Sequence, residues 1–528
     1  MAWYYTFEAK EIQRFILQSD KLRDMVGGSE LVSRLCDEFL KECLKAQGIN
    51  TPESVIIANA AGWARIKFED EQQARNFYAT WPLLVSRFAP GIQIIQALIR
   101  MDGDLPEAME AGFRVLREAR NLTYPDLPEI GPLVERSPRT GGAAVEFDRE
   151  REAKVLIDQT TLRKRAYTEG RSLTKKISED LPHDAWPYEL DDIVSGNSAY
   201  VAVIHADGND LGATLMKVKE HLKNNSADAE RIYRGFTRAI EEATVAAVRA
   251  ACEATIFAEY DEKLKKKLAA RPIVLGGDDL TIIIRADLAL KFTRVFLEAF
   301  ETGSREILEK YLPLASIKER PEQLTACAGI AFIKKAYPFS AAYQMAESLC
   351  DHTKKVAKKY RTESGGLYVP SSFTFHRITT SMAEGFSEAK KQELTGRGIQ
   401  GKEPLKFWFG PYAVGDLGGT PSRSGEGVVG ALPRFADLVK LQKALDKLPT
   451  GSIRTLISTM HNDPVSARKD YDRILQVAGK DQGAAFSVAL ETLTGPEGHP
   501  LWNDRNQTPL ADAHLLRETL EGGAHAEA

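Results

Sequence analysis

Cysteine is scarce in this sequence, and no two cysteines have the spacing of a structural zinc site. Only five occur among 528 residues, and none belongs to a Cys-x-x-Cys pair. They are Cys36, Cys43, Cys252, Cys327 and Cys350. Scattered cysteines are typical of a reducing cytoplasm, where a buried thiol behaves as a small hydrophobic side chain. We therefore expect a cytoplasmic protein without a structural zinc site.

Long hydrophobic runs are missing as well. No stretch approaches the roughly 20 apolar residues of a membrane-spanning helix, and the first residues, MAWYYTFEAKEIQRF, lack the cationic and apolar regions of a signal peptide. The net charge is only −4, so the chain as a whole lacks the positive charge of proteins that coat nucleic acid. A local basic surface would still suffice for binding.

The sequence has the composition of an ordinary globular protein, and it contains two similar successions of predicted strands and helices. Hydrophobic residues make up 43% and charged residues 27% of the chain, which suits about three domains. Residues 1–105 alternate strands and helices in the order βαββαβ, and residues 196–370 repeat this order more strongly. Residues 106–195 predict an irregular connecting module, and residues 371–528 predict a C-terminal helical bundle. We expect an α+β fold with two ferredoxin-like domains that arose by duplication.

Glycine-rich segments predict three irregular regions. The stretch Leu22–Leu31 holds Gly27-Gly28-Ser29, which indicates a loop followed by a helix N-cap. Gly415–Gly430 is rich in glycine and serine and predicts a mobile loop. The last residues, from Gly522, predict a flexible tail.

Three aspartates stand at the ends of apolar strands in the second ferredoxin-like unit. Asp207 lies in HADGNDLG, directly after the strand expected at Ala199–Ala206. Asp278 and Asp279 lie in VLGGDDLTIII, at the turn between two apolar strands. An acid that ends one central strand and an acid pair on the adjacent hairpin can form one centre, so we expect these three side chains to meet.

Such an acidic centre suits divalent metal ions and phosphoryl chemistry. Mg²⁺ prefers carboxylate, carbonyl and water oxygens, and a two-metal site places acidic ligands around ions about 4 Å apart. Catalysis of phosphoryl transfer is mainly positioning and electrostatic stabilisation. Gly276 and Gly277 would permit a tight turn and a close approach of a triphosphate to the backbone. Gly208 would present its carbonyl to a metal.

Each of these motifs also has a purely structural interpretation. Gly and Asp are turn residues, so GGDD alone predicts a simple hairpin turn equally well. The flanking apolar strands favour the metal site, because unpaired charge at the edge of a buried sheet is costly. Asp210 is expected as the N-cap of the next helix, and His205 as an ordinary strand residue. Lys354 and Lys355 fit either a solvated helix face or a contact to triphosphate.

In their order along the chain, ADGNDLG and GGDD resemble the nucleotide-cyclising palm of the large subunit of type III CRISPR effector complexes. That palm is related to the GGDEF diguanylate cyclases, and the resemblance is closest to the branch found in Cmr-type complexes. The family's first segment is Asp-Gly-Asp-x-Met-Gly. Here Asp207 and Gly208 match, Asn209 replaces the second Asp, and Leu211 and Gly212 fill the last two places.

Two further segments carry the resemblance through the same unit. Thr325–Leu349 is similar to the family's strand, proline turn and helix. The helix that contains AESLCDHTK is similar to the A-D/E-x-x-L-x-x-A-K helix of both families. This match maps their phosphate-binding lysine onto Lys354, although Cys350 stands at the place of the leucine and Thr353 at that of the second alanine.

The beginning of the chain resembles the family's first palm. The segment FEAKEIQRFILQSDKLRDMVGGSELVS has its I/V-Q-x-F-I and R-D-x-x-x-G-S elements, but the comparable hairpin, Ala60–Phe68, reads AAGWARIKF and lacks acids. We expect this palm to be catalytically silent and to help to seat nucleotide at the interface between the palms. Because the chain begins there, we expect no HD nuclease domain. The place of the family's zinc ligands, GPLVERSPRTGGAAVEF, holds no cysteine.

The resemblance implies a metal-dependent nucleotidyltransferase that joins ATP into 3′–5′ linked cyclic oligoadenylates with the help of two Mg²⁺ or Mn²⁺ ions. Asp207 and Asp279 would be metal ligands, Asp278 a ligand or an aid to deprotonation, and Lys354 the triphosphate contact. The nucleotide-binding glycines and asparagine would be Gly208, Asn209, Gly276 and Gly277. A cyclic dinucleotide, a mixed-base product and a non-catalytic scaffold stay open. The resemblance implies guide and target RNA as partners, held through other CRISPR subunits. Association with a second copy of the chain stays open.

Overall fold

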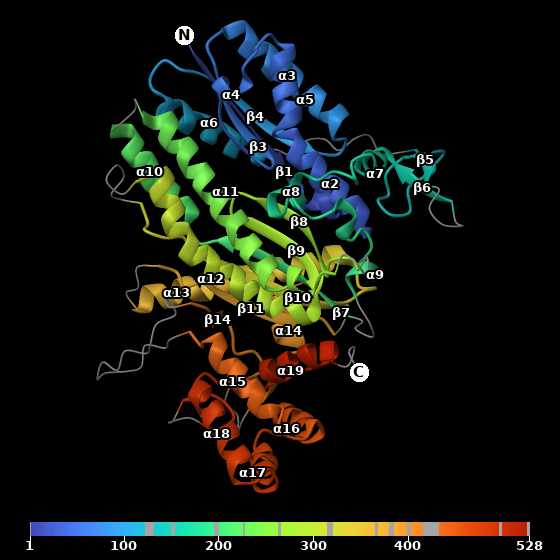
Figure 1. Ribbon diagram of the computed structural model, residues 1–528, viewed down its shortest axis with the longest axis vertical. Helices are drawn as coiled ribbons and strands as arrows, with labels where there is room; N and C mark the ends of the chain where they lie inside the picture. The colour runs from blue at the N-terminus through green and yellow to red at the C-terminus, as the bar shows by residue number, and fades with distance from the viewer. Residues whose placement is uncertain are drawn as a thin grey trace.

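The computed structural model describes residues 2–121, 131–148, 154–194, 200–224, 228–261, 266–313, 320–364, 368–379, 385–398, 403–415, 432–495 and 499–524. Three parts follow one another along the longest axis (Figure 1). The N-terminal sheet and its helices lie at one end, a second sheet with long helices lies in the middle, and the C-terminal helices lie at the other end. Helices and strands are both abundant, which confirms the α+β class.

The first sheet has four antiparallel strands in the order β2-β3-β1-β4. The strands are β1 (Trp3–Lys10), β2 (Ile56–Ala60), β3 (Trp63–Phe68) and β4 (Gln93–Arg100). Its helices are α1 (Ile12–Leu17), α2 (Leu22–Leu35), α3 (Glu38–Ala46), α4 (Pro52–Val55) and α5 (Glu71–Phe88). This strand order is ferredoxin-like, as the sequence predicts. Buried aromatic side chains of β1 and α5 fill the core, with Tyr5, Phe7, Phe77 and Trp81 in mutual contact.

The loop predicted at Leu22–Leu31 is wrong, because this stretch lies inside helix α2. The glycines serve close packing there. A Cβ atom on Gly27 would lie 1.8 Å from the carbonyl oxygen of Lys164, and one on Gly28 would lie 3.3 Å from the Cα of Ile16. Contacts with two neighbouring segments thus outweigh the low helix propensity of glycine.

The second sheet has six strands in the order β14-β11-β10-β7-β9-β8. They are β7 (Tyr200–Gly208), β8 (Ala270–Gly276), β9 (Asp279–Arg285), β10 (Ala326–Lys334), β11 (Ser372–Arg377) and β14 (Tyr412–Ala413). The four strands β8-β9-β7-β10 are antiparallel and repeat the ferredoxin-like order. Strand β11 then pairs in parallel with β10, so the sheet continues beyond residue 370.

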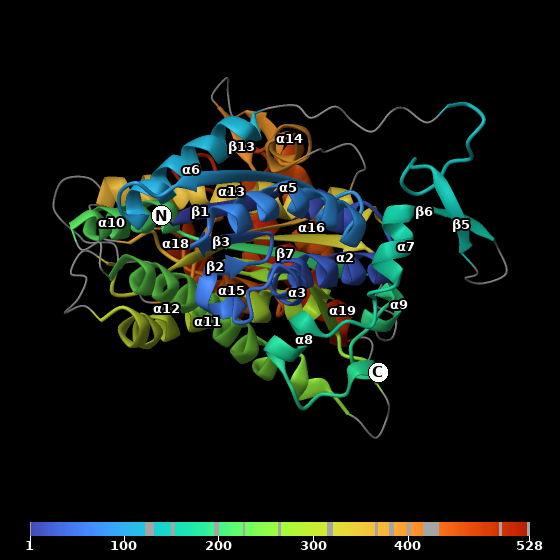
Figure 2. The same ribbon diagram turned by 90° about the horizontal axis from the view of Figure 1, so that it is seen from above.

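Helices cover both faces of this sheet. They are α10 (Leu211–Asn224), α11 (Ala229–Ala254), α12 (Ala286–Tyr311) and α13 (Phe339–Ser364), with the short turn η3 (Phe257–Glu259). Helices α11 and α12 run side by side along one face in Figures 1 and 2, and α13 packs against β7 and β10. A central strand covered on both sides reads as a continuous apolar run, which is why β7 begins YVAVIHA.

Successive side chains of β7 enter two different cores. Ala202 and Ile204 belong to the core with α11 and α12. Val201 and Val203 belong to the core that includes α13 and the first sheet. Side chains alternate between the faces of a strand. Asp207 is therefore on the same face of β7 as Val201 and Val203, which is the face covered by α13.

The connecting segment holds one long helix and a small hairpin. Its elements are α6 (Leu105–Arg120), β5 (Ala144–Asp148), β6 (Val155–Asp158), α7 (Gln159–Arg165), α8 (Ser172–Ile177), η1 (His183–Ala185) and α9 (Leu190–Ile193). Both views show the β5–β6 hairpin standing off the body of the molecule (Figures 1 and 2). Its base is held by Arg165, which pairs with Asp148 and, at 2.8 Å, with the fully buried Asp24 of α2.

The C-terminal part is mainly helical, although β11 and β14 of the second sheet also lie within residues 371–528. It contains α14 (Phe386–Gln392), β12 (Thr395–Gly398), β13 (Pro404–Lys406), α15 (Phe435–Leu445), α16 (Thr450–Asn462), α17 (Ala467–Val477), α18 (Lys480–Thr494) and α19 (Leu510–Ala524). The predicted tail is wrong in part, because α19 continues through Gly522 to Ala524. Extending an existing helix adds one hydrogen bond per residue, which outweighs a short glycine signal. Apart from Gly415 itself, the predicted loop Gly415–Gly430 lies outside the described residues.

No helix within the described ranges is both long enough and apolar enough to cross a membrane.

Candidate metal and nucleotide site

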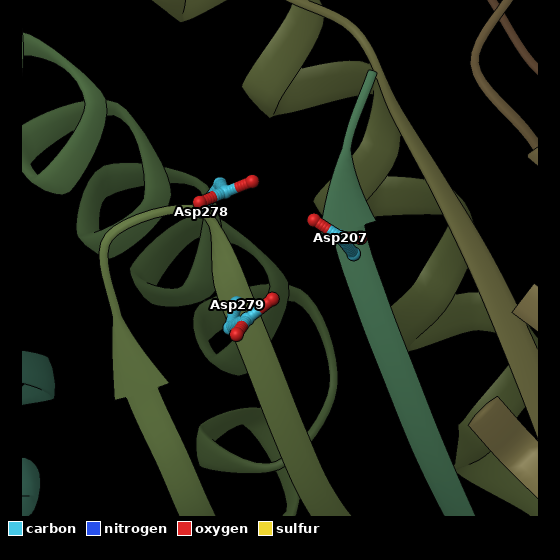
Figure 3. Close-up of side chains that lie close together, drawn as sticks. All are labelled: Asp207, Asp278 and Asp279. Atoms are coloured by element: carbon cyan, nitrogen blue, oxygen red, sulfur yellow. The ribbon is translucent and has the colours of Figure 1, made fainter. Parts of the chain in front are cut away.

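The three predicted aspartates meet at one edge of the second sheet. Asp207 lies near the end of β7, and Asp279 opens β9. These strands pair with Ala206 opposite Leu280, so Asp207 and Asp279 come next to each other on the same face. Figure 3 shows their carboxyl groups pointing toward one another, with Asp278 at the adjoining turn. One oxygen from each of the three side chains lies within 4.8 Å of the others.

A two-residue turn sets the position of Asp278. Gly276 and Asp279 form the last pair of the β8–β9 hairpin, and Gly277 and Asp278 connect them. Gly277 has a φ of 61°, a conformation that glycine adopts at the first central position of tight hairpins. A Cβ atom added there would meet nothing within 4 Å, so this backbone is open to a ligand.

The other two glycines of the site are used for packing within the protein. A Cβ atom on Gly276 would lie 2.9 Å from the Cβ of Ala61, at the tip of the β2–β3 hairpin of the first sheet. A Cβ atom on Gly208 would lie 3.0 Å from both the Cβ and the Oδ2 of Asp278. Gly276 therefore brings the two hairpins together, and Gly208 allows the end of β7 to approach the acidic turn.

Helix α13 brings Lys354 to the acids. The helix approaches β10 closely at Gly329, where a Cβ atom would lie 2.0 Å from the carbonyl oxygen of Ala346. Cys350 and Thr353 are buried against this strand and donate to the carbonyl oxygens of Cys327 and Ala328. Cys350 and Thr353, the two residues that depart from the family's helix pattern, thus lie on the face of α13 that packs against β10.

The Lys354 ammonium group donates hydrogen bonds to the Asp207 carboxylate and, at 2.9 Å, to the carbonyl oxygen of Gly208. Burial favours a lower pKa of Lys354, but the charge of Asp207 outweighs it, so the pKa is raised. The lysine therefore stays charged beside the acids.

The pKa values of the three acids are shifted in different directions. Burial, with help from a hydrogen bond to Asp207 and the charge of Asp279, raises the pKa of Asp278 to about 8. Burial and the charge of Asp207 raise the pKa of Asp279 to about 7. Burial acts in the same direction on Asp207, but a hydrogen bond from Asp278 and the charge of Lys354 outweigh it and lower its pKa. A cation bound among these acids would stabilise the ionised forms of Asp278 and Asp279.

Asn209 and Asp210 follow the acids but make contacts of their own. The buried Asn209 side chain donates to the Thr325 hydroxyl at 3.1 Å, and its backbone N–H donates to the Thr325 carbonyl at 2.8 Å. Asp210 stands before α10, as expected of an N-cap, but its carboxylate pairs with Arg361 and, at 3.1 Å, with Lys358 of α13. Sequence reasoning missed this pairing, although the four- and seven-residue spacing from Lys354 places both cations on one helix face.

His205 is a strand residue, as expected. Its ring lies 5.5 Å from the Tyr343 ring, and its Nδ1 lies 3.3 Å from the Thr281 hydroxyl. Burial lowers the pKa of His205 to about 4, so the ring is neutral at physiological pH and adds no positive charge to the site.

Open space lies along the same helix. An open surface hollow of about 570 Å³ is lined by Gln344, Glu347, Ser348 and Asp351 of α13. One residue of this hollow, Glu347, also makes a small charge contribution to the raised pKa of Asp279. The sequence offered no signal for it beyond helical spacing.

The segment of the chain that contains this site matches a known protein family. Residues 200–362 match the family model described as Cas10/Cmr2, second palm domain. The chain carries a Cas10/Cmr2 palm domain. The matched range includes all three aspartates and Lys354, and it confirms the predicted resemblance to the large subunit of type III CRISPR complexes. The Cmr-type branch stays a prediction.

Solved structures are similar to this chain at low identity. A Csm1–Csm4 cassette in complex with cA4 matches with a TM-score of 0.49 and 12% identity, over 99% of this chain and 70% of that chain. Csm1 in T. onnurineus matches with a TM-score of 0.48 and 14% identity, over 99% and 69%. A cassette in complex with AMPPNP matches with a TM-score of 0.42 and 14% identity, over 67% and 53%, so the chain spans about half of its length. None of the curated proteins matches the chain.

Proposed function

We propose that this protein is a palm-domain nucleotidyltransferase that joins ATP into 3′–5′ linked oligoadenylates and closes them into rings. The convergence of Asp207, Asp278 and Asp279 within 4.8 Å carries the proposal, together with the family match over the same residues. The solved structures named above include complexes with AMPPNP and cA4, so ATP and a cyclic oligoadenylate are the natural candidates for substrate and product.

The residues of the site fit a divalent cation. Three carboxylates and the Gly208 carbonyl offer only oxygen atoms, which Mg²⁺ and Mn²⁺ prefer. Burial, and after it the charges of the neighbouring acids, raise the pKa values of Asp278 and Asp279, and a bound cation would stabilise their ionised forms. Bound there, one or two ions would stabilise charge on the phosphates and lower the pKa of an attacking 3′-hydroxyl.

The protein's own residues would position the two nucleotides. Lys354 would move to the triphosphate of one ATP and balance its charge. The open backbone at Gly277 would let the phosphates approach the turn. Asn209, fixed by Thr325, would hold the end of β7 in place beside the ribose. Asp278, at the turn beside the other two acids, would either ligate the cation or accept a proton from the attacking hydroxyl.

The first palm would act as a wall of the site. Its hairpin brings Ala61 against Gly276 and offers no acid of its own at Ala60–Phe68. We propose that it is catalytically silent and seats nucleotide at the palm–palm interface. The division of the chain at residues 105 and 195, a cytoplasmic location, and association with guide and target RNA through other CRISPR subunits belong to the same proposal. The boundary predicted at residue 370 is wrong, because β11 and β14 extend the sheet of the second palm to Ala413.

The test is product analysis with purified full-length protein. We would incubate it with each nucleoside triphosphate and Mg²⁺ or Mn²⁺ and identify the products by mass spectrometry, beside the variant with Asp278→Asn and Asp279→Asn. Cyclic oligoadenylates from the wild type alone are the expected result. A cyclic dinucleotide or a mixed-base ring would correct the product. If neither protein makes product, even with guide–target RNA complexes added, the protein is a scaffold instead.

A further inference from the structure

Lys354 uses the same oxygens that a metal ion would need. Its ammonium group donates to the Asp207 carboxylate and to the Gly208 carbonyl, and both groups belong to the proposed ligand set. A cation held at these atoms would lie within a few ångströms of the ammonium. At such distances two positive charges in a partly buried site repel each other strongly.

We propose that Lys354 is an internal counter-cation that holds the acidic site until a nucleoside triphosphate draws it away, so that metal and nucleotide bind cooperatively. This inference rests on the proposed function and adds the order in which the site fills. With the ammonium on Asp207, a metal ion binds weakly. With the ammonium on a triphosphate, the lone pairs of Asp207 and Gly208 are released to the metal.

The surroundings of Lys354 support a two-position side chain. Its helix is fixed at β10 by the close contact at Gly329 and by the buried Thr353, so the backbone has no freedom to withdraw. The side chain is mostly buried but keeps 17% of its surface exposed, so part of it is open to solvent. A flexible lysine stem can carry the charge between two positions while the helix stays still.

The other cations of this helix are held elsewhere. Lys358 and Arg361 lie one and two turns further along α13 and pair with Asp210 rather than with the three acids. Either side chain could therefore bind a triphosphate without breaking an ion pair to a proposed metal ligand. Competition with a metal ion for the oxygens of Asp207 and Gly208 should therefore depend on Lys354 and not on the general positive charge of α13.

Linkage makes the inference quantitative. If the nucleotide removes a competitor of the metal, each ligand strengthens the binding of the other by the same factor. We expect this factor to be about tenfold to a hundredfold in the wild type, within the usual range of such coupling. Removing the ammonium should make metal binding tighter without nucleotide and should abolish most of the coupling.

The experiment measures Mn²⁺ binding to the full-length protein by electron paramagnetic resonance of the free ion. Each protein is titrated with and without an ATP analogue that has a methylene bridge between its α and β phosphates, so no turnover occurs. The proteins are the wild type, Lys354→Met, Lys354→Arg and Lys355→Met. Lys355 is exposed on the same helix, and its substitution removes an equal charge away from the acids.

We expect Lys354→Met to bind Mn²⁺ at least about tenfold more tightly than the wild type without nucleotide, and to gain little when the analogue is added. Lys354→Arg and Lys355→Met should behave like the wild type. Equal or weaker Mn²⁺ binding by Lys354→Met overturns the inference and leaves the proposed metal site intact. If no protein binds Mn²⁺ with or without the analogue, both the inference and the proposed function fail. Circular dichroism confirms that each variant is folded, and Lys354→Gln repeats the test if the methionine variant is not.

Discussion

Ala61 of the first palm and Gly276 of the acidic hairpin lie so close together that a single added methyl group would make them collide. A Cβ atom on Gly276 would be 2.9 Å from the Cβ of Ala61, but no nearer than 3.8 Å to any other atom of that residue. The contact therefore joins a hairpin without acids to the hairpin that carries Asp278 and Asp279. The methyl group of Ala61 fills the space that Gly276 leaves open.

This contact predicts a compensating pair of substitutions. Gly276→Ala should lower stability by about 1–3 kcal/mol, the usual cost of overpacking, and should reduce activity by moving the acidic turn. Ala61→Gly in the same protein should restore most of both, because it removes the only close atom. A double-mutant cycle of denaturant unfolding and product formation measures the coupling. Additive effects of the two substitutions would contradict the contact.

A second prediction concerns pH and metal binding. Metal ions bind ionised carboxylates, and the pKa values of Asp278 and Asp279 are raised to about 8 and about 7. As the pH falls below 8, protons occupy these groups, so the Mn²⁺ affinity should fall, at most tenfold per pH unit for each proton displaced. Calorimetric titrations at pH 6, 7 and 8.5 in buffers of different ionisation enthalpy would also count the protons released. An affinity that does not change with pH would show that the metal binds elsewhere.

The same raised pKa values predict how stability responds to pH without metal. A carboxyl whose pKa is higher in the folded state than in the unfolded state binds its proton more tightly when folded. Its contribution to stability is complete below the unfolded pKa near 4 and is lost as the pH rises through about 7 to 8. Relative to the wild type, Asp278→Asn plus Asp279→Asn should therefore melt at a higher temperature at pH 8.5, with little difference at pH 5.

Mg²⁺ provides the control for this comparison. Because a ligand stabilises the state that binds it, Mg²⁺ should raise the melting temperature of the wild type at pH 8.5 but not that of the double asparagine variant. An equal response of both proteins to Mg²⁺ would place the effect outside the acidic site.

A further prediction concerns the buried ion pairs at the base of the β5–β6 hairpin. Asp24 is fully buried and pairs with Arg165 at 2.8 Å. Asp24→Ala would remove one of the two buried carboxylates that pair with Arg165, while Asp148 stays. Breaking a buried ion pair typically costs up to about 3–5 kcal/mol. Chemical denaturation should show this loss. The exposed pair between Glu11 and Arg14 is the matched control, and Glu11→Ala should change stability very little.

The sequence predicted the chemistry of the site better than its packing. The apolar run before Asp207 and the hairpin at Asp278 and Asp279 required only strand alternation and turn preferences, so their convergence could be predicted. The position of Lys354 came from the resemblance to a known helix pattern.

The packing glycines show why the remainder could not be predicted. Gly27 and Gly28 looked like a loop, and Gly276 like a phosphate contact, because the sequence does not reveal which distant segment approaches a missing side chain. Lys164 and Ala61 are those neighbours, more than 100 residues away in each case. Pairing of β11 with β10 is likewise a long-range contact that local patterns do not specify.

That pairing has a practical consequence for work with the isolated catalytic palm. A protein shortened to end at residue 370 would lose β11 and β14 and would leave the backbone of Cys327–Phe332 without its neighbour on one side. An exposed edge of this kind, in a strand as apolar as β10, invites pairing between molecules and aggregation. The smallest version that keeps this edge covered must extend at least through Ala413.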